Sequence, residues 1–214
     1  MIEVIGRGVA ETSVTTLDGW HITLEVAEIG IGPIYLCATA AASVDLCPSA
    51  VAEFAETATI DALDSEDQDL GVGNGLSGET ARSLMLDYAM PWLTTQSRPQ
   101  ASQGAPGGRS ARFEGFATKD GVTIPFIAEV DVLSTIRGTP ALGGVPMPAL
   151  ELPRADLELT IAVDPLRWWS VVGFDELAAL AEDGELLVVP ADSTAANALI
   201  LGMIGAPPLF KLHE

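Results

Sequence analysis

An acidic stretch from Asp64 to Asn74 holds the side chains best suited to bind a metal ion. Asp64, Glu66, Asp67, Asp69 and Asn74 place five oxygen-bearing side chains within eleven residues, and calcium prefers hard oxygen ligands of this kind. No register of the stretch supplies both the central glycine and the terminal glutamate that an EF-hand loop needs. The composition therefore predicts a solvated acidic loop, and an irregular calcium site on Asp64, Asp67, Asp69 and Asn74 is the alternative.

A glycine pattern overlaps the end of this stretch. The residues from Gly73 to Gly78 match the G-x-G-x-x-G pattern of dinucleotide-binding loops. Such a loop needs a buried strand immediately before it, within a strand–helix–strand unit. The preceding residues here are acidic and would repel a pyrophosphate, so the pattern predicts an exposed turn.

Nucleophilic catalysis has little support in the residue types. The chain has two histidines, His21 and His213, and it lacks the G-x-S-x-G motif of serine hydrolases. His21 follows Trp20 in an alternating stretch, so the two side chains are expected on opposite faces of a strand. A hydrolase that uses a pair of carboxylates remains an alternative, because 30 acidic residues are available.

Two adjacent tryptophans, Trp168 and Trp169, are the most prominent aromatic residues. Asp164 and Pro165 before them supply a cap and a first-turn proline, which predicts a short helix. Neighbouring side chains on a helix point about 100° apart. One ring is therefore expected to plug the core, and a ligand platform made by the pair is the alternative.

Two cysteines, Cys37 and Cys47, flank a run of small residues. A disulfide between them would close a short loop and stabilise the fold by about 2.5–3 kcal/mol, whereas two buried free thiols are the alternative. The spacing fits no zinc-binding pattern. A disulfide favours an exported protein, in the periplasm, on an outer-membrane lipid anchor or outside the cell. Met1 leads directly into Ile2 and Glu3 without a basic region, so a leader is expected to be absent from this chain.

The charge balance excludes one class of partner. Ten basic and 30 acidic residues give a net charge of −20, and 48% of the residues are hydrophobic, which is too apolar for a disordered acidic tail. The dispersed basic residues cannot form a phosphate-binding stripe, so nucleic acid is excluded and an anionic membrane surface is disfavoured. The uncharged stretches Ile29–Val44 and Ser193–Phe210 are interrupted by glycine and proline, and neither is expected to span a membrane.

Alternation of apolar and polar residues, rather than a helical period, dominates the chain. Asp120-Gly121 between Ser110–Lys119 and Val122–Leu133 predicts a β-hairpin with a type I′ turn. The other predicted strands are Ile2–Arg7, Ser13–Leu17, Trp20–Ile29, Thr57–Leu63, Thr80–Leu86, Asp156–Val163, Leu186–Val189 and Leu209–Leu212. Short helices are predicted at Ser49–Ala55, Leu166–Ser170, Phe174–Ala181 and Thr194–Met203, and long loops at Asp64–Gly78, Ser97–Gly108 and Arg137–Pro153. We therefore expect one mostly β domain over residues 1–214, an antiparallel β-sandwich or open barrel with a few short helices and long loops.

Two segments resemble a known family. The stretch from Thr15 to Cys37, with Asp18-Gly19-Trp20-His21 and a later Ile-Gly-Ile-Gly-Pro-Ile-Tyr-Leu run, resembles the opening of uncharacterised exported bacterial lipoproteins. More distantly, it is similar to the methanobactin-associated MbnP-like copper-protein family. The segment Val163–Trp169 also resembles the step from a strand to a short helix in that family. The resemblance implies an exported β-sandwich. In the copper-binding members it also implies a copper site of histidines and an oxidised tryptophan, made by a partner haem enzyme, for which Trp20 and His21 are the matching residue types here.

Taken together, these patterns predict an exported, acidic cell-envelope module that binds a cell-surface or protein partner or has a structural role, without catalysis. An MbnP-like mononuclear copper protein is the first alternative, with copper or calcium as the metals to consider. A carboxylate-dependent hydrolase is the second alternative.

Overall fold

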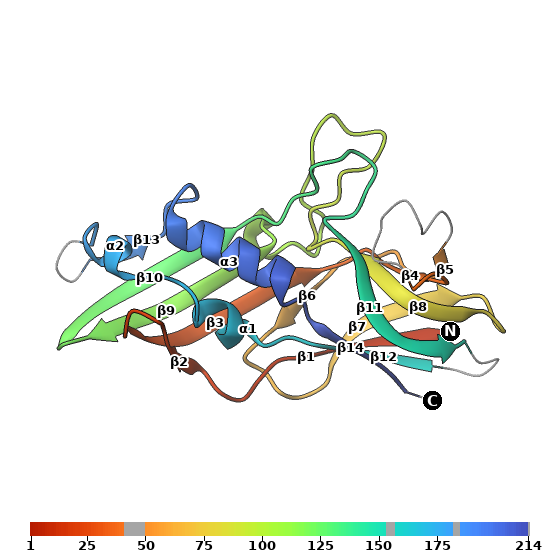
Figure 1. Cartoon of the computed structure of the whole chain (residues 1–214), viewed down its shortest axis with the longest axis horizontal. Helices are drawn as coiled ribbons and strands as arrows, with labels where there is room; N and C mark the ends of the chain where they lie inside the picture. Colours follow the sequence, from red (N-terminus) through yellow and green to blue (C-terminus); the bar gives the residue numbers. More distant parts are fainter. Residues whose placement is uncertain (41–49, 153–156, 182–184, 214) are drawn as a thin grey trace.

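The structure is a computed structural model that describes residues 1–40, 50–152, 157–181 and 185–213, and the strands of these residues form two β-sheets (Figure 1). The larger sheet has eight strands in the order β11 (Leu142–Glu151), β8 (Thr80–Leu86), β4 (Ile34–Cys37), β5 (Ala50–Phe54), β7 (Gln68–Gly75), β1 (Ile2–Arg7), β12 (Leu157–Ala162) and β14 (Leu209–His213). The six-stranded sheet has the order β13 (Leu187–Val188), β10 (Val122–Val130), β9 (Ala111–Lys119), β3 (His21–Ile31) and β2 (Ser13–Thr15), and β6 (Ala58–Asp61) pairs with β3. The prediction of a mostly β sandwich or open barrel with short helices is confirmed.

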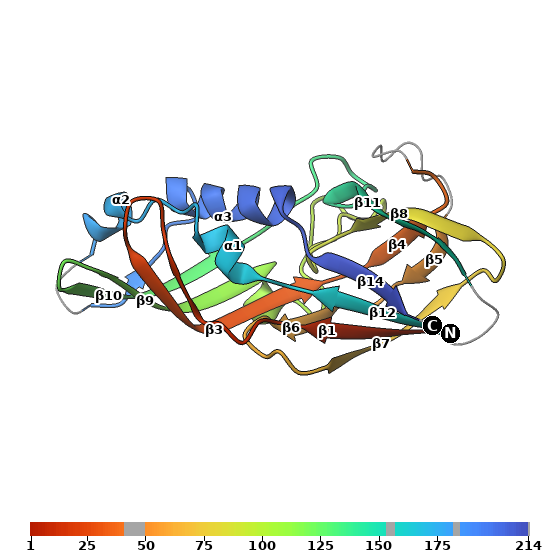
Figure 2. The same cartoon turned by 60° about the horizontal axis from the view of Figure 1, so that its bottom comes forward.

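The molecule is elongated, and its two sheets occupy opposite ends (Figures 1 and 2). The helices α1 (Pro165–Trp169), α2 (Asp175–Ala178) and α3 (Thr194–Gly205) lie over the six-stranded sheet. A short 3-10 helix, η2 (Pro106–Gly108), precedes β9. Among the described strands, β1–β12 and β10–β13 pair in parallel and the other ladders are antiparallel.

Strand β3 shows how alternation builds the six-stranded sheet. Trp20, Ile22 and Leu24 are buried, while His21 and Glu25 face solvent. A bulge between Leu24 and Val26 then shifts the register, so the odd-numbered positions from Ala27 onward face the core. The predicted hairpin is also present, because Asp120 and Gly121 both have positive φ values, of 50° and 81°, between β9 and β10.

An aromatic cluster joins the helices to this sheet. The ring centroid of Trp168 lies 6.5 Å from that of Phe113, and Trp169 lies 5.6 Å from Phe113 and 4.8 Å from Phe126. Both tryptophans are 1% exposed or less. The structure therefore places both Trp168 and Trp169 in the core, and a ligand platform made by the pair stays a prediction.

The two tryptophans differ in one hydrogen bond, which makes them a matched pair. The Trp168 indole N–H donates to the Ala206 carbonyl at 2.9 Å, whereas the Trp169 N–H is buried without a partner among the described residues. Phenylalanine at either position replaces the indole by a smaller ring, so both substitutions remove a similar amount of buried aromatic surface. Only the substitution at position 168 also leaves the Ala206 carbonyl without its indole donor. We expect Trp168→Phe to lower the free energy of unfolding by about 1 kcal/mol more than Trp169→Phe. Urea denaturation of the two variants measures this difference, and equal losses would contradict it.

Three predicted segments differ from the structure. The alanine-rich segment Ser49–Ala55, predicted as a helix, contains β5, which pairs with β4 and β7. Its place between two strands overrides the helical preference of its alanines. The predicted loop Asp64–Gly78 contains β7, where glycines permit close packing: a Cβ on Gly73 would lie 2.7 Å from the Glu53 carbonyl oxygen. The predicted loop Arg137–Pro153 contains β11, which tolerates prolines because it is an edge strand.

Cys37 is buried at the end of β4, and Cys47 lies outside the described residues. The Cys37–Cys47 disulfide therefore stays a prediction. We expect thiol titration of the unreduced, denatured protein to find no reactive cysteine, because the loop between the two positions is short enough to close. Two reactive thiols would contradict the disulfide and weaken the case for export.

Candidate functional site

The acidic residues proposed to bind calcium are each engaged locally. Asp67 forms an ion pair with Arg7, which holds the pKa of that carboxyl below its usual value. Asp64 accepts a hydrogen bond from the Glu66 amide, and Asp69 accepts one from the Gly71 amide, both at 2.9 Å. Asn74 lies on β7 opposite Glu53. Within the described ranges, no three His, Cys, Asp or Glu side chains gather closely enough to hold a metal ion.

This arrangement gives a calcium experiment a definite expected result. Asp64 and Asp69 each accept a hydrogen bond within their own turn, and Asp67 pairs with Arg7, so the three carboxylates do not converge on one point. We therefore expect calorimetric titration with calcium to give the same weak heat, without saturation, for the wild type and for Asp67→Ala/Asp69→Ala. A saturable signal that the double substitution abolishes would restore the calcium hypothesis.

The residue pair proposed for copper is divided between two environments. Trp20 is buried, and its indole N–H donates to the Asp175 carboxylate at 2.8 Å. His21 is exposed on the opposite face of β3. Asp175 also accepts a hydrogen bond from Lys119, and Lys119 lies 5.6 Å from the Trp20 ring centroid. Trp20 is thus part of the contact between the sheet and α2, and the structure does not bring it together with His21 as a ligand pair.

A different segment builds the strongest candidate site. Asp87 follows β8 directly, and its backbone is tied to the start of β4. The Asp87 amide donates to the Pro33 carbonyl at 3.1 Å, and the Asp87 carbonyl accepts from the Gly32 amide at 2.9 Å. Ala89, whose φ is +53°, donates to the Gly32 carbonyl at 3.1 Å. A non-glycine residue with positive φ is uncommon and persists only where its surroundings enforce it.

The Asp87 carboxyl group is buried and only partly satisfied. Asp87 is 3% exposed as a residue. Its Oδ1 atom accepts a hydrogen bond from the Ala141 amide at 2.8 Å. Among the described residues, none donates to Oδ2. Burial raises the pKa of Asp87 to about 6, against the opposing effect of the Ala141 hydrogen bond. A carboxyl group with this pKa is mostly ionised at neutral pH although its residue is largely buried.

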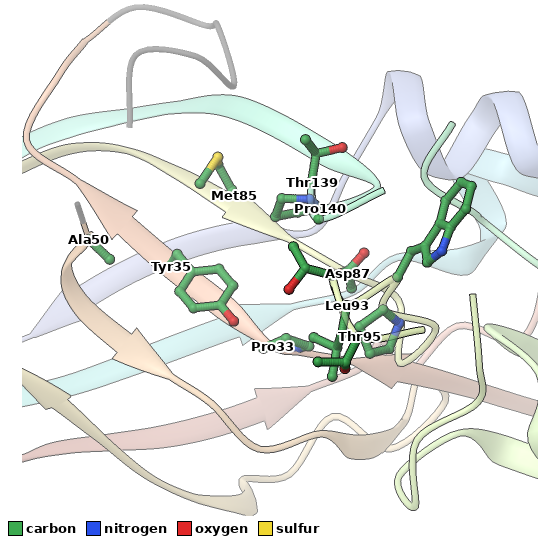
Figure 3. Close-up of a pocket in the computed structure, with 13 residues that line it drawn as sticks. Pro33, Tyr35, Ala50, Met85, Asp87, Leu93, Thr95, Thr139 and Pro140 are labelled. Carbon is green, nitrogen blue, oxygen red and sulfur yellow. The ribbon is translucent and has the colours of Figure 1, made fainter. Parts of the chain in front are cut away.

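Asp87 lies in a pocket of about 440 Å³ at the base of the loops that follow β8 and β10 (Figure 3). Figure 3 shows its carboxyl group between the Tyr35 ring and the turn at Thr139 and Pro140. The remaining wall is mostly apolar or weakly polar, with Pro33, Ala50, Met85, Pro91, Trp92, Leu93, Thr94, Thr95 and Gly138. Among these described lining residues, Asp87 is the one that carries a charge.

A second cavity adjoins the first. It has a volume of about 670 Å³ and shares Pro33, Tyr35, Pro91 and Leu93 with the Asp87 pocket. Its own wall adds Ala55, Glu56, Thr57, Ser102, Gln103 and Gly104. The two cavities therefore share a wall of four residues, and Glu56 is among the residues that line the second cavity.

The sequence analysis missed Asp87. The signal that could have found it is a single acid within an otherwise apolar run from Leu84 to Met90, because a charge in such a run is rarely buried without a role. The pocket walls carried no comparable signal, since Tyr35, Trp92 and Thr139 come from three distant segments.

Comparison with known proteins does not extend this description: no family model, no curated protein and no solved structure matches the chain. None of the described helices combines the length and apolar character needed to cross a membrane.

Proposed function

We propose that this chain is a non-catalytic binding module and that the Asp87 pocket is its ligand site. The observation that carries the proposal is the carboxyl group of Asp87, a residue that is 3% exposed, at a mostly apolar cavity, with one oxygen that accepts no hydrogen bond from the described residues. A buried ionised carboxylate is costly unless a donor or a cation pairs with it. A ligand that donates to Oδ2 would supply this partner, and an apolar cavity with few convergent polar groups is the usual form of a small-molecule site.

The composition of the pocket favours binding over hydrolysis. A carboxylate-dependent hydrolase needs two carboxyl groups about 5–9.5 Å apart on either side of the substrate bond. Asp87 is the single acid among the described residues of its pocket, and Glu56 lines the adjoining cavity but not this one. Asp87 is the single candidate base among the described lining residues, and no second carboxyl group, histidine or lysine lines the same pocket to serve as its acid partner. We also propose that the module is exported to the cell envelope, on the basis of the predicted Cys37–Cys47 disulfide.

A ligand-observed NMR screen with small neutral, cationic and anionic compounds tests the pocket. Thr95 is an exposed lining residue, so Thr95→Trp should fill the cavity without disturbing the core. Leu17, which is 88% exposed in a distant turn, gives the control Leu17→Trp. We expect compounds that bind the wild type and Leu17→Trp but not Thr95→Trp. Compounds that bind Thr95→Trp as well as the wild type, or a screen without binders, would overturn the proposal.

A further inference from the structure

We infer that the ligand is a linear aliphatic diamine, with one ammonium group at Asp87 and the other in the adjoining cavity near Glu56. This inference rests on the proposed function, because it names the class of ligand for the same pocket.

The charges around the pocket select a cation. Asp87 supplies the one formal charge among the described lining residues, and its Oδ2 atom accepts no hydrogen bond from the described residues, so it can accept one from a ligand. Arg137, which donates to the Thr94 carbonyl at the rim, is exposed and does not line the cavity. An anionic ligand would meet Asp87 without a compensating base, whereas an ammonium group pairs with it. The net charge of −20 adds long-range attraction for cations.

The walls fit an alkylammonium better than a hydrated metal ion. Tyr35 and Trp92 contribute aromatic rings, and aromatic faces attract ammonium groups. Leu93 and Met85 offer apolar surface for methylene groups. Metal ions of the calcium or magnesium kind need several oxygen ligands, and the pocket offers a single carboxyl group.

The adjoining cavity accounts for the second ammonium group. Pro33, Tyr35, Pro91 and Leu93 line both cavities, so an alkyl chain can lie along this shared apolar surface. Beyond it, Glu56 is the single charged residue among the described lining residues, and Gln103 and Ser102 add polar side chains. Because Glu56 is exposed, its contribution is expected to be smaller than that of Asp87.

Calorimetric titrations with diaminopentane, pentylamine and pentanediol test this assignment on wild-type protein at about 0.15 M ionic strength, where distant charges are screened. We expect the diamine to bind more tightly than the monoamine, and the diol least. Asp87→Asn keeps the acceptor for the Ala141 amide but removes the charge, and it should weaken both amines about tenfold or more. Glu56→Gln should weaken the diamine about two- to fivefold and leave pentylamine unchanged. Glu25→Gln removes an exposed carboxylate outside both cavities and should change neither.

The possible outcomes separate the two proposals. If pentanediol binds as tightly as diaminopentane and Thr95→Trp abolishes both, the pocket is a ligand site but the diamine assignment is wrong. If diaminopentane binds Thr95→Trp as tightly as wild type, the amine binds elsewhere on the acidic surface and both proposals fail. A wild type that binds no amine, or an equal loss on Glu25→Gln and Asp87→Asn, overturns the diamine assignment.

Discussion

Asp87→Asn is expected to stabilise the free protein by about 3 kcal/mol at neutral pH. Burial raises the pKa of Asp87 from an ordinary value of 3.8 to about 6 in the folded state. Each unit of difference corresponds to about 1.4 kcal/mol. Between these two values the folded state binds the proton more tightly than the unfolded state does, so the stability contributed by Asp87 falls as the pH rises. Asparagine keeps the acceptor for the Ala141 amide and does not ionise.

The measurement is urea denaturation of the wild type and Asp87→Asn across this pH range. We expect similar free energies of unfolding near pH 4, and a difference that grows to its full value of about 3 kcal/mol above pH 6. Glu25→Gln, at an exposed position, serves as the control for the loss of one negative charge. An Asp87→Asn variant that is less stable than the wild type at neutral pH would show that Asp87 is a structural group rather than an unpaired site residue.

Gly32→Ala is expected to destabilise the protein by about 3–5 kcal/mol and to abolish ligand binding. Gly32 has a φ of +104°, and a Cβ at this position would lie 2.3 Å from the Glu56 carbonyl oxygen. Alanine would therefore force the backbone to move where Gly32 pairs with Asp87 and where Pro33 and Tyr35 enter the pocket.

A substitution at Gly78 separates the cost of the positive φ from the cost of the contact with the Glu56 carbonyl oxygen. The φ of Gly78 is +85°, but no atom of the described residues lies within 4 Å of the position that a Cβ would occupy. Gly78→Ala should cost only the backbone strain, about 1–2 kcal/mol, and should leave ligand binding unchanged. Equal losses of stability in the two variants would contradict the proposed contact between position 32 and Glu56.

The elements with strong local signals were predictable from the sequence. Alternation and the Asp120-Gly121 turn defined the β9–β10 hairpin, and Asp164-Pro165 defined the start of α1, where the Asp164 carboxylate accepts the Leu166 amide at 3.1 Å. Strand β5 could not be predicted from its own composition, because its conformation depends on pairing with β4 and β7. Strand β7 could not be predicted either, because its glycines are typical of a loop in the sequence, whereas in the structure they permit close packing against neighbouring strands.

The candidate site was harder to predict than the fold. Sequence reasoning favoured residues that are close together in the chain, such as Asp64, Asp67 and Asp69, but the structure uses these for local turns and an ion pair. The Asp87 pocket instead combines segments around Tyr35, Trp92 and Thr139. No local pattern reports such a juxtaposition, because it depends on how β4, β8 and the loop before β11 meet.

Titration of the Asp87 carboxyl carbon by NMR, with and without diaminopentane, tests the central claim most directly. In the free protein we predict a pKa of about 6, caused by burial. An ammonium group bound at the carboxylate stabilises the ionised form, so saturating diaminopentane should lower this pKa, whereas pentanediol should leave it unchanged. A carboxyl that titrates near its ordinary value in the free protein, or one whose pKa does not respond to the diamine, would contradict the account of Asp87 as an unpaired anchor for a cationic ligand.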